Sequence, residues 1–117
     1  MVERQLKVTV ESAGTADRLP LLRVSGEVDI QTSPILEEEL TKVLDRGASS
    51  VLVDLSDVSF LDSTGLSVLV AGLKRCQGIG GALRLVSPRP NVLRVLEITG
   101  LTEAFHVDAG GQDDTSD

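Results

Sequence analysis

The sequence contains no tryptophan or tyrosine, and Phe60 and Phe105 are its only phenylalanines. A hydrophobic core must therefore be built from valine, leucine and isoleucine. The same scarcity removes the aromatic platforms on which proteins stack single-stranded nucleic acid. The formal net charge of -7 repels phosphate backbones and anionic lipid headgroups. We therefore expect neither nucleic acid nor a membrane to bind the chain directly.

Other kinds of site lack the residues they need. Cys76 is the only cysteine, so an internal disulfide is impossible and a reducing compartment is expected. One histidine, one cysteine and scattered carboxylates have no metal-ligand spacing, and no cofactor is predicted. The acidic run 37–39 is interpreted as a solvated helix face, in the first turns where the helix dipole favours acids. No stretch of 18 apolar residues or secretion signal is present, which predicts a cytoplasmic protein.

The length of 117 residues and the hydrophobic content of 41% suit one compact domain. We place this domain at residues 1–108. The remaining stretch, 109–117, has no apolar residue beyond Ala109 and carries several acids, and it is predicted to be a disordered acidic tail.

Hydrophobic periodicity predicts four strands. Residues 5–12 alternate apolar and polar side chains, and 19–26 resume a strand after turn-forming residues at 12–17, so these two are expected to pair as a hairpin. The nearly continuous apolar runs at 51–55 and 82–87 are typical of strands covered on both faces.

Three helices alternate with the later strands. The first is expected at 34–46, with Thr32 or Ser33 as its cap, and the second at about 64–77. A third is expected to start at 87–88. A short closing strand fragment follows it. The order predicts an α/β fold, with an N-terminal hairpin followed by strand–helix units in a mostly parallel sheet.

The stretch FLDSTGLSVL, residues 60–69, is the main candidate site. A strand ends here and an apolar helix begins, at the edge where open α/β sheets keep their sites. Asp62 or Ser63 is suited to cap the helix by accepting a bond from a first-turn amide. Only one side chain need be the cap, so the neighbouring hydroxyl is left for another role.

Two catalytic or binding interpretations of this stretch fail. The strand-to-helix elbow of serine hydrolases needs glycine two residues before and two after the serine, and Leu61 occupies the first position. His106, the only histidine, lies in an apolar element away from the stretch. No lysine follows Gly65, as a phosphate-binding loop would require. The glycines at 78–81 follow a helix and precede a strand, the reverse of a dinucleotide site. No enzymatic activity is expected.

A serine on a protruding turn is suited to accept a phosphoryl group. The product adds about -1.5 to -2 charges, which the positive end of the helix partly offsets. Asp62 and Asp29 would repel the new anion. Phosphorylation of Ser63 would thus change the surface more than the fold.

Three segments together resemble the STAS domain, and in particular bacterial anti-sigma factor antagonists. The segment VLVDLSDVSFLDSTGLSVLVAGLKRC, 51–76, looks like the family signature. VSGEVDIQTSPILEEEL, 24–40, resembles its Gly-Glu-hydrophobic-Asp turn and first helix, and GGALRLVSPRPNVLRVLEITGL, 80–101, resembles its closing strand and helix. The resemblance covers about residues 5–107 and implies a mixed sheet of four or five strands flanked by helices.

The resemblance also implies a partner-switching role. In such systems the unphosphorylated antagonist binds an anti-sigma factor, which is also a serine kinase using its own ATP, and so frees a sigma factor. The kinase phosphorylates the serine that follows the motif aspartate, which matches Ser63, and a serine phosphatase reverses the step. Thr64 matches a neighbouring hydroxyl that is a cap or a secondary acceptor.

The residues implied to contact the partner are Asp29, Asp62, Ser63, Thr64, Gly65 and Ser67. Ser67 departs from the pattern, because this position is commonly glycine in the family. Family members also include scaffold subunits of stress complexes and accessory proteins of transport complexes. A non-switching binding module of this kind is the alternative, and the intact Ser63 favours phosphoregulation.

Overall fold

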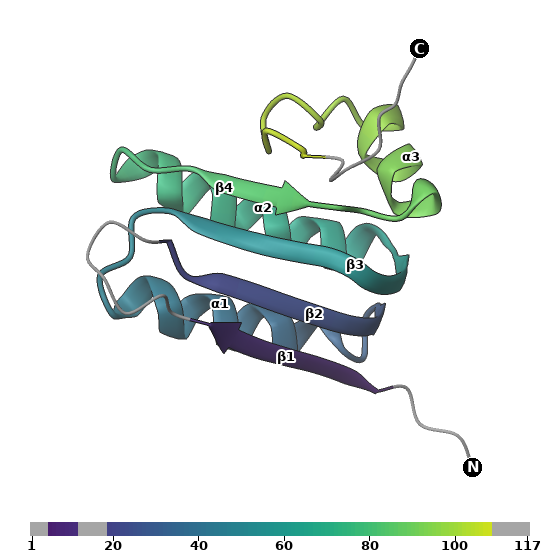
Figure 1. The fold of residues 1–117 in the computed structure, drawn as a ribbon, viewed down its shortest axis with the longest axis horizontal. Coiled ribbons are helices and arrows are strands. Elements are labelled where there is room, and N and C mark those ends of the chain that lie inside the picture. Colours follow the sequence, from purple (N-terminus) through teal and green to yellow (C-terminus); the bar gives the residue numbers. More distant parts are fainter. Residues whose placement is uncertain (1–4, 12–18, 109–117) are drawn as a thin grey trace.

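In the part of the chain that the structure describes, four strands form one sheet in the order β1-β2-β3-β4 (Figure 1). The computed structural model describes residues 5–11 and 19–108. β1 pairs antiparallel with β2, whereas β2, β3 and β4 are parallel, so the predicted hairpin and the mixed α/β sheet are both confirmed. The elements are β1 (Leu6–Glu11), β2 (Leu21–Val28), α1 (Ser33–Asp45), β3 (Val51–Leu61), α2 (Ser63–Gly78), β4 (Leu83–Val86) and α3 (Pro90–Ile98).

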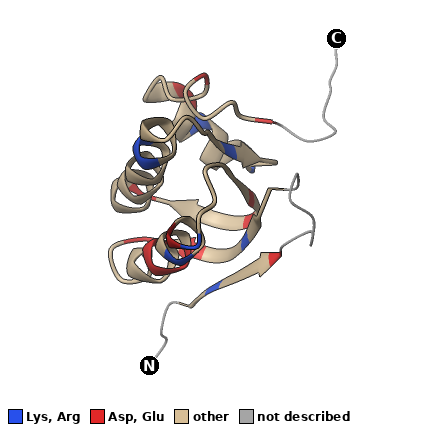
Figure 2. Ribbon diagram, turned by 90° about the vertical axis from the view of Figure 1, so that its left-hand side faces the viewer, with Lys and Arg blue, Asp and Glu red and all other residues tan. Residues whose placement is uncertain are grey.

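Helices α1 and α2 lie side by side on one face of the sheet, so the fold has two main layers (Figure 2). α1 packs on β1 and β2, and α2 packs on β3 and β4. Alternate strand residues point into this layer and are fully buried, as strand geometry requires. They include Leu22, Val24, Val51, Val53, Leu55, Leu83 and Leu85.

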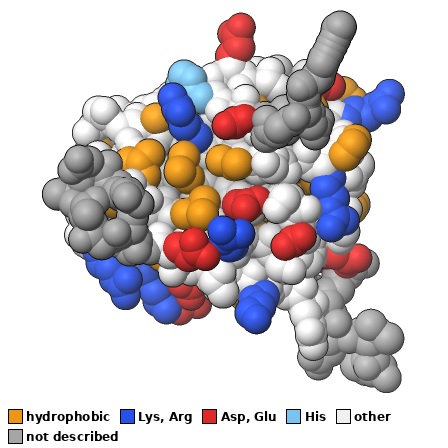
Figure 3. Space-filling view, in the orientation of Figure 1, with side chains coloured by type: hydrophobic (Ala, Val, Ile, Leu, Met, Phe, Trp, Pro, Cys, Tyr) orange, Lys and Arg blue, Asp and Glu red, His pale blue; other side chains and the backbone are white. Residues whose placement is uncertain are grey.

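Where the described residues form it, the other face of the sheet mixes charged with apolar side chains (Figure 3). Arg23 lies between two acids, with Nε 2.8 Å from Glu11 Oε2 and a terminal nitrogen 3.7 Å from Asp54 Oδ2. Leu21 and Leu52, which are neighbours in the register, are only half-buried. These strands are therefore covered on one face, and the prediction of coverage on both faces was wrong for 51–55 and also for 82–87, where Arg84 is exposed.

The short strand β4 leaves the second half of β3 without a strand partner on that side, and α3 takes the position. Arg89 Nε donates to the carbonyl of Ser56 at 2.9 Å, and Asn91 Nδ2 donates to that of Ser59 at 2.9 Å. α3 begins at Pro90, with Arg89 at the cap position. The predicted start at 87–88 was wrong, because Ser87 has a φ of 54°, which is incompatible with a helix.

The closing segment after α3 runs along the outer side of β4. It makes a single parallel bridge, between Val86 and Asp108, so the expected strand fragment is reduced to one pair. Both backbone polar groups of Leu85 bond to this segment: its amide donates to the carbonyl of Phe105 at 3.3 Å, and its carbonyl accepts from the amide of Asp108 at 2.8 Å. The predicted turn at 12–17 and the predicted tail at 109–117 lie outside the described residues.

Candidate functional site

Strand β3 passes directly into helix α2 at Asp62. This residue is the cap of α2, and its Oδ1 accepts a hydrogen bond from the Gly65 amide at 3.0 Å. The helix then begins at Ser63, one residue earlier than predicted. Of the two candidate caps, the acid is therefore the one used, and Thr64 lies inside the first turn and is not a cap.

Ser63 is exposed at the first position of α2. Its backbone carbonyl accepts a bond from the hydroxyl of Ser67 at 2.9 Å. Within the described residues, its own hydroxyl has no hydrogen-bond partner. Thr64 is half-buried and so less accessible than Ser63. The structure thus leaves an uncommitted serine hydroxyl at the positive end of a 16-residue helix.

Gly65 is buried, and its missing side chain lets α2 approach the strands closely. A Cβ at this position would lie 2.5 Å from Val28 Cγ1 and 2.7 Å from Leu61 Cδ1, well inside contact distance. Gly65 therefore packs α2 against the ends of β2 and β3, and its contact with a partner stays a prediction.

The second acid of the site, Asp29, lies at the end of the neighbouring strand. Val28 and Leu61 are partners in the parallel register, and the Asp62 amide donates to the Val28 carbonyl at 3.1 Å. Asp29 and Asp62 are the residues directly after this pair, and parallel strands end at the same edge of a sheet. The structure therefore brings the two predicted acids to one edge, together with Ser63.

Asp29 is nevertheless buried, with 7% of its surface exposed. Its Oδ1 accepts bonds from the amides of Gln31 at 2.9 Å and Thr32 at 3.1 Å. These contacts hold the turn that leads into α1. Asp29 thus lies at the same edge as Ser63, and its Oδ1 atom is committed to the turn.

Thr32 occupies the cap position of α1, as predicted, but its side chain does not cap the helix. Its hydroxyl donates to the carbonyl of Glu27 at 2.6 Å and accepts from the amide of Asp29 at 2.9 Å. Ser33 is the first helical residue rather than a cap. The first turn of α1 contains no acid, so the run 37–39 lies further along the helix than expected.

A shallow groove of about 380 Å³ runs along α2 from Ser63. Ser67 and Lys74 lie on its exposed wall, and Val70 is half-buried in it. The spacing of these residues places them on one side of the helix, with Lys74 at the far end. Sequence reasoning did not place Val70 or Lys74 at the site; counting helical turns from Ser63 would have found both. The groove is lined by Ser63, Leu66, Ser67, Val70, Ala71 and Lys74.

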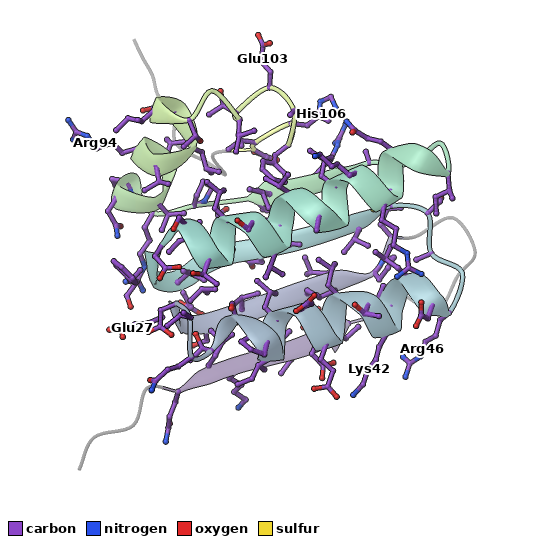
Figure 4. All side chains as sticks on the ribbon, turned by 180° about the vertical axis from the view of Figure 1, so that it is seen from behind. Glu27, Lys42, Arg46, Arg94, Glu103 and His106 are labelled. Carbon is purple, nitrogen blue, oxygen red and sulfur yellow. The ribbon has the colours of Figure 1, made fainter. Side chains whose placement is uncertain are left out.

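The histidine and the cysteine that a catalytic or metal site would use lie away from Ser63. His106 is exposed and lies on the closing segment, away from the edge marked by Glu27 (Figure 4). Cys76 is fully buried, and desolvation raises the pKa of its thiol while Arg75 opposes the shift. The described residues contain no cluster of three or more candidate metal ligands. In the same part of the chain, no helix has the length and apolar character needed to cross a bilayer.

Comparison with known proteins decides the family. The family described as the STAS domain matches residues 10–112. The chain belongs to the STAS domain family. Among curated proteins, the anti-sigma-B factor antagonist of Staphylococcus aureus strain NCTC 8325 is 38% identical over 96 residues, which cover 82% of this chain and 89% of that protein.

Solved structures show the same STAS fold. An anti-sigma factor antagonist from Mycobacterium paratuberculosis superimposes with a TM-score of 0.78 at 31% identity, covering 89% of this chain and 86% of that one. The Bacillus cell fate determinant SpoIIAA in its phosphorylated form gives a TM-score of 0.70 at 18% identity, covering 92% and 93%. At that identity the second likeness shows the fold alone.

The cap of α2 can be tested apart from any binding role. Asp62→Ala removes the acceptor for the Gly65 amide and should lower the free energy of unfolding by about 1 kcal/mol. Asp62→Asn keeps an oxygen acceptor and should lose much less. Urea unfolding of both variants makes the comparison. Equal losses for Ala and Asn would show that the charge, and not the hydrogen bond, stabilises the helix start.

Proposed function

We propose that this STAS domain is an anti-sigma factor antagonist that acts by partner switching. Its unphosphorylated form binds an anti-sigma factor that is also a serine kinase, and this binding releases a sigma factor. Phosphorylation of Ser63 ends the binding, and a serine phosphatase restores it. The chain itself is a cytoplasmic regulator without catalytic activity, and the ATP is held by the partner.

The free Ser63 hydroxyl is the observation that carries the proposal. Asp62 caps α2, so Ser63 can be modified without removing the bond that starts the helix. Because Ser63 is exposed, a kinase active site can reach it without unfolding the domain. The relationship to the staphylococcal antagonist supports the same role.

A phosphate at Ser63 would change the charge of the docking surface. It brings about -1.5 to -2 charges to an edge that already carries Asp29 and Asp62. The amino end of α2 offsets part of this charge and so limits the effect on the fold. The phosphorylated form of SpoIIAA shares the fold of this chain, which supports an effect on the surface.

The proposed contact surface joins this edge to the groove along α2. Ser63 lies at one end of the groove and Lys74 at the other, with Ser67 and Val70 between them. A partner seated in the groove would cover the Ser63 hydroxyl. Phosphorylation would then place an anion inside the interface, where desolvation makes an unpaired charge costly.

Phosphate mapping tests the proposed acceptor. The protein is incubated with the cognate kinase and ATP, and the modified residue is located by mass spectrometry. We expect one phosphate at Ser63, none on Ser63→Ala, and unchanged incorporation on Thr64→Ala, the matched control. Phosphate on Thr64 alone, or elsewhere in the chain alone, would contradict the assignment.

A non-switching binding module remains the second candidate, because STAS domains also occur in scaffold and transport complexes. Capture of the bound protein from the native cell extract distinguishes the two. An ATP-binding serine kinase in the bound fraction supports switching. A transport complex or a large assembly of STAS proteins supports the module instead.

A further inference from the structure

Strand β1 forms one edge of the sheet. It pairs with β2 alone, so the amide and carbonyl groups along its outer side have no strand partner among the described residues. On the opposite side of the sheet, β4 is bordered by the closing segment. An open strand edge is a template for pairing with another strand.

The two faces of β1 differ in chemistry. Val8 and Val10 are paired with the buried residues Val24 and Leu22, so they lie on the helix-covered face. Lys7, Thr9 and Glu11 therefore lie on the open face, with the basic residue near the start of the strand and the acidic residue at its end (Figure 2).

Helix α1 covers this edge incompletely. One hollow, of about 560 Å³, is lined by the start of β1 together with Ile35, which is 41% exposed. Another, of about 210 Å³, is lined by Val10, Pro20, Val43, Arg46 and Ala48. Val10 itself is 36% exposed, although it faces the helix layer. Apolar surface therefore remains uncovered at Ile35, beside the start of β1, and at Val10, near its end.

The sequence of β1 complements itself in antiparallel pairing. We infer that β1 pairs antiparallel with β1 of a second copy, with Thr9 of the two copies directly opposite each other. This register places Lys7 of each copy opposite Glu11 of the other. Val8 then lies opposite Val10, so apolar residues meet apolar residues on the helix-covered face. The pairing is isologous, as a two-fold dimer requires.

Competing registers satisfy fewer of these pairs. A slip by one residue would place each valine on the wrong face of the joined sheet. A slip by two residues, with Val8 opposite Val8, keeps the faces but separates Lys7 from Glu11. Opposite-charge pairs across strands are weak, so the charges select the register while hydrogen bonds and valine burial supply the attraction.

The dimer leaves the proposed phosphorylation site uncovered. Helix α2 packs on β3 and β4, on the other half of the sheet from β1. Self-association through β1 and binding of a partner along α2 therefore use separate surfaces. Failure of the dimer would leave the function proposed for Ser63 unaffected.

Site-directed cross-linking tests the register directly. Thr9→Cys places two thiols opposite each other, with Cα atoms about 5 Å apart, within disulfide range. Lys7→Cys places its two copies about 14 Å apart along the strands and is the matched control. Under mild oxidation we expect Thr9→Cys to give at least about tenfold more covalent dimer than Lys7→Cys on a non-reducing gel.

Mixing variants gives a second measurement. Lys7→Cys mixed with Glu11→Cys should cross-link far more than either variant alone, because these positions face each other only in the proposed register. The unmodified protein sets the background, since Cys76 is fully buried and therefore out of reach of a thiol on a second copy. Equal, slow cross-linking of all variants and mixtures would overturn the proposal.

Discussion

Ser63→Asp is expected to weaken binding of the anti-sigma factor by at least about 100-fold, because an unpaired charge buried in an interface costs several kcal/mol. Ser63→Ala should bind within a few-fold of the wild-type protein and resist phosphorylation. It would therefore act as a permanently active antagonist. Isothermal titration calorimetry of the wild-type protein and both variants with the purified partner measures the difference.

Ser49→Asp is the matched control for this experiment. Ser49 is also an exposed serine, but it precedes β3 and so lies at the opposite end of that strand from Ser63. The substitution adds the same charge outside the proposed interface and should leave the affinity unchanged. Similar losses for Ser49→Asp and Ser63→Asp would assign the effect to net charge and contradict a local role for Ser63.

Phe105→Ala should lower the free energy of unfolding by about 3–5 kcal/mol, the usual loss when a buried phenylalanine is truncated. Phe105 is fully buried in the closing segment, where it is among the largest fully buried side chains. Its carbonyl also accepts a bond from the amide of Leu85, so the segment and β4 are joined at this residue. Urea unfolding followed by circular dichroism gives the change.

Phe60, the other phenylalanine, provides the control. It is 44% exposed, so Phe60→Ala should cost roughly 1 kcal/mol or less. Since a domain of this size has a total stability of about 5–15 kcal/mol, the first substitution threatens the fold and the second does not. Equal losses for the two variants would show that the closing segment does not form part of the core.

The sequence predicted the parts of the fold that follow from local patterns. Alternating residues in β1 and the turn-forming residues after it predicted the hairpin, and the helix expected at about 64–77 is α2. The candidate site was also predicted, because Asp62 and Ser63 stand where a strand meets a helix. Because the strand comes before the helix in the chain, the site lies at the carboxyl end of β3.

Features that depend on contacts between distant segments were not predictable. The choice of Pro90 over Pro88 as the start of α3 follows the left-handed conformation of Ser87 and the bond from Arg89 to Ser56. The commitment of Asp29 to the turn before α1 depends on Thr32, whose side chain was expected to cap the helix. Burial of Gly65 likewise depends on Val28, from another strand.

The proposed function depends on whether a phosphate at Ser63 controls docking while the domain stays folded. The decisive measurement compares the affinity of the unmodified protein with that of the fully Ser63-phosphorylated protein for the same purified partner. We predict a loss of at least about 100-fold, with an unfolding midpoint close to that of the unmodified protein. Equal affinities for the two forms would contradict the account.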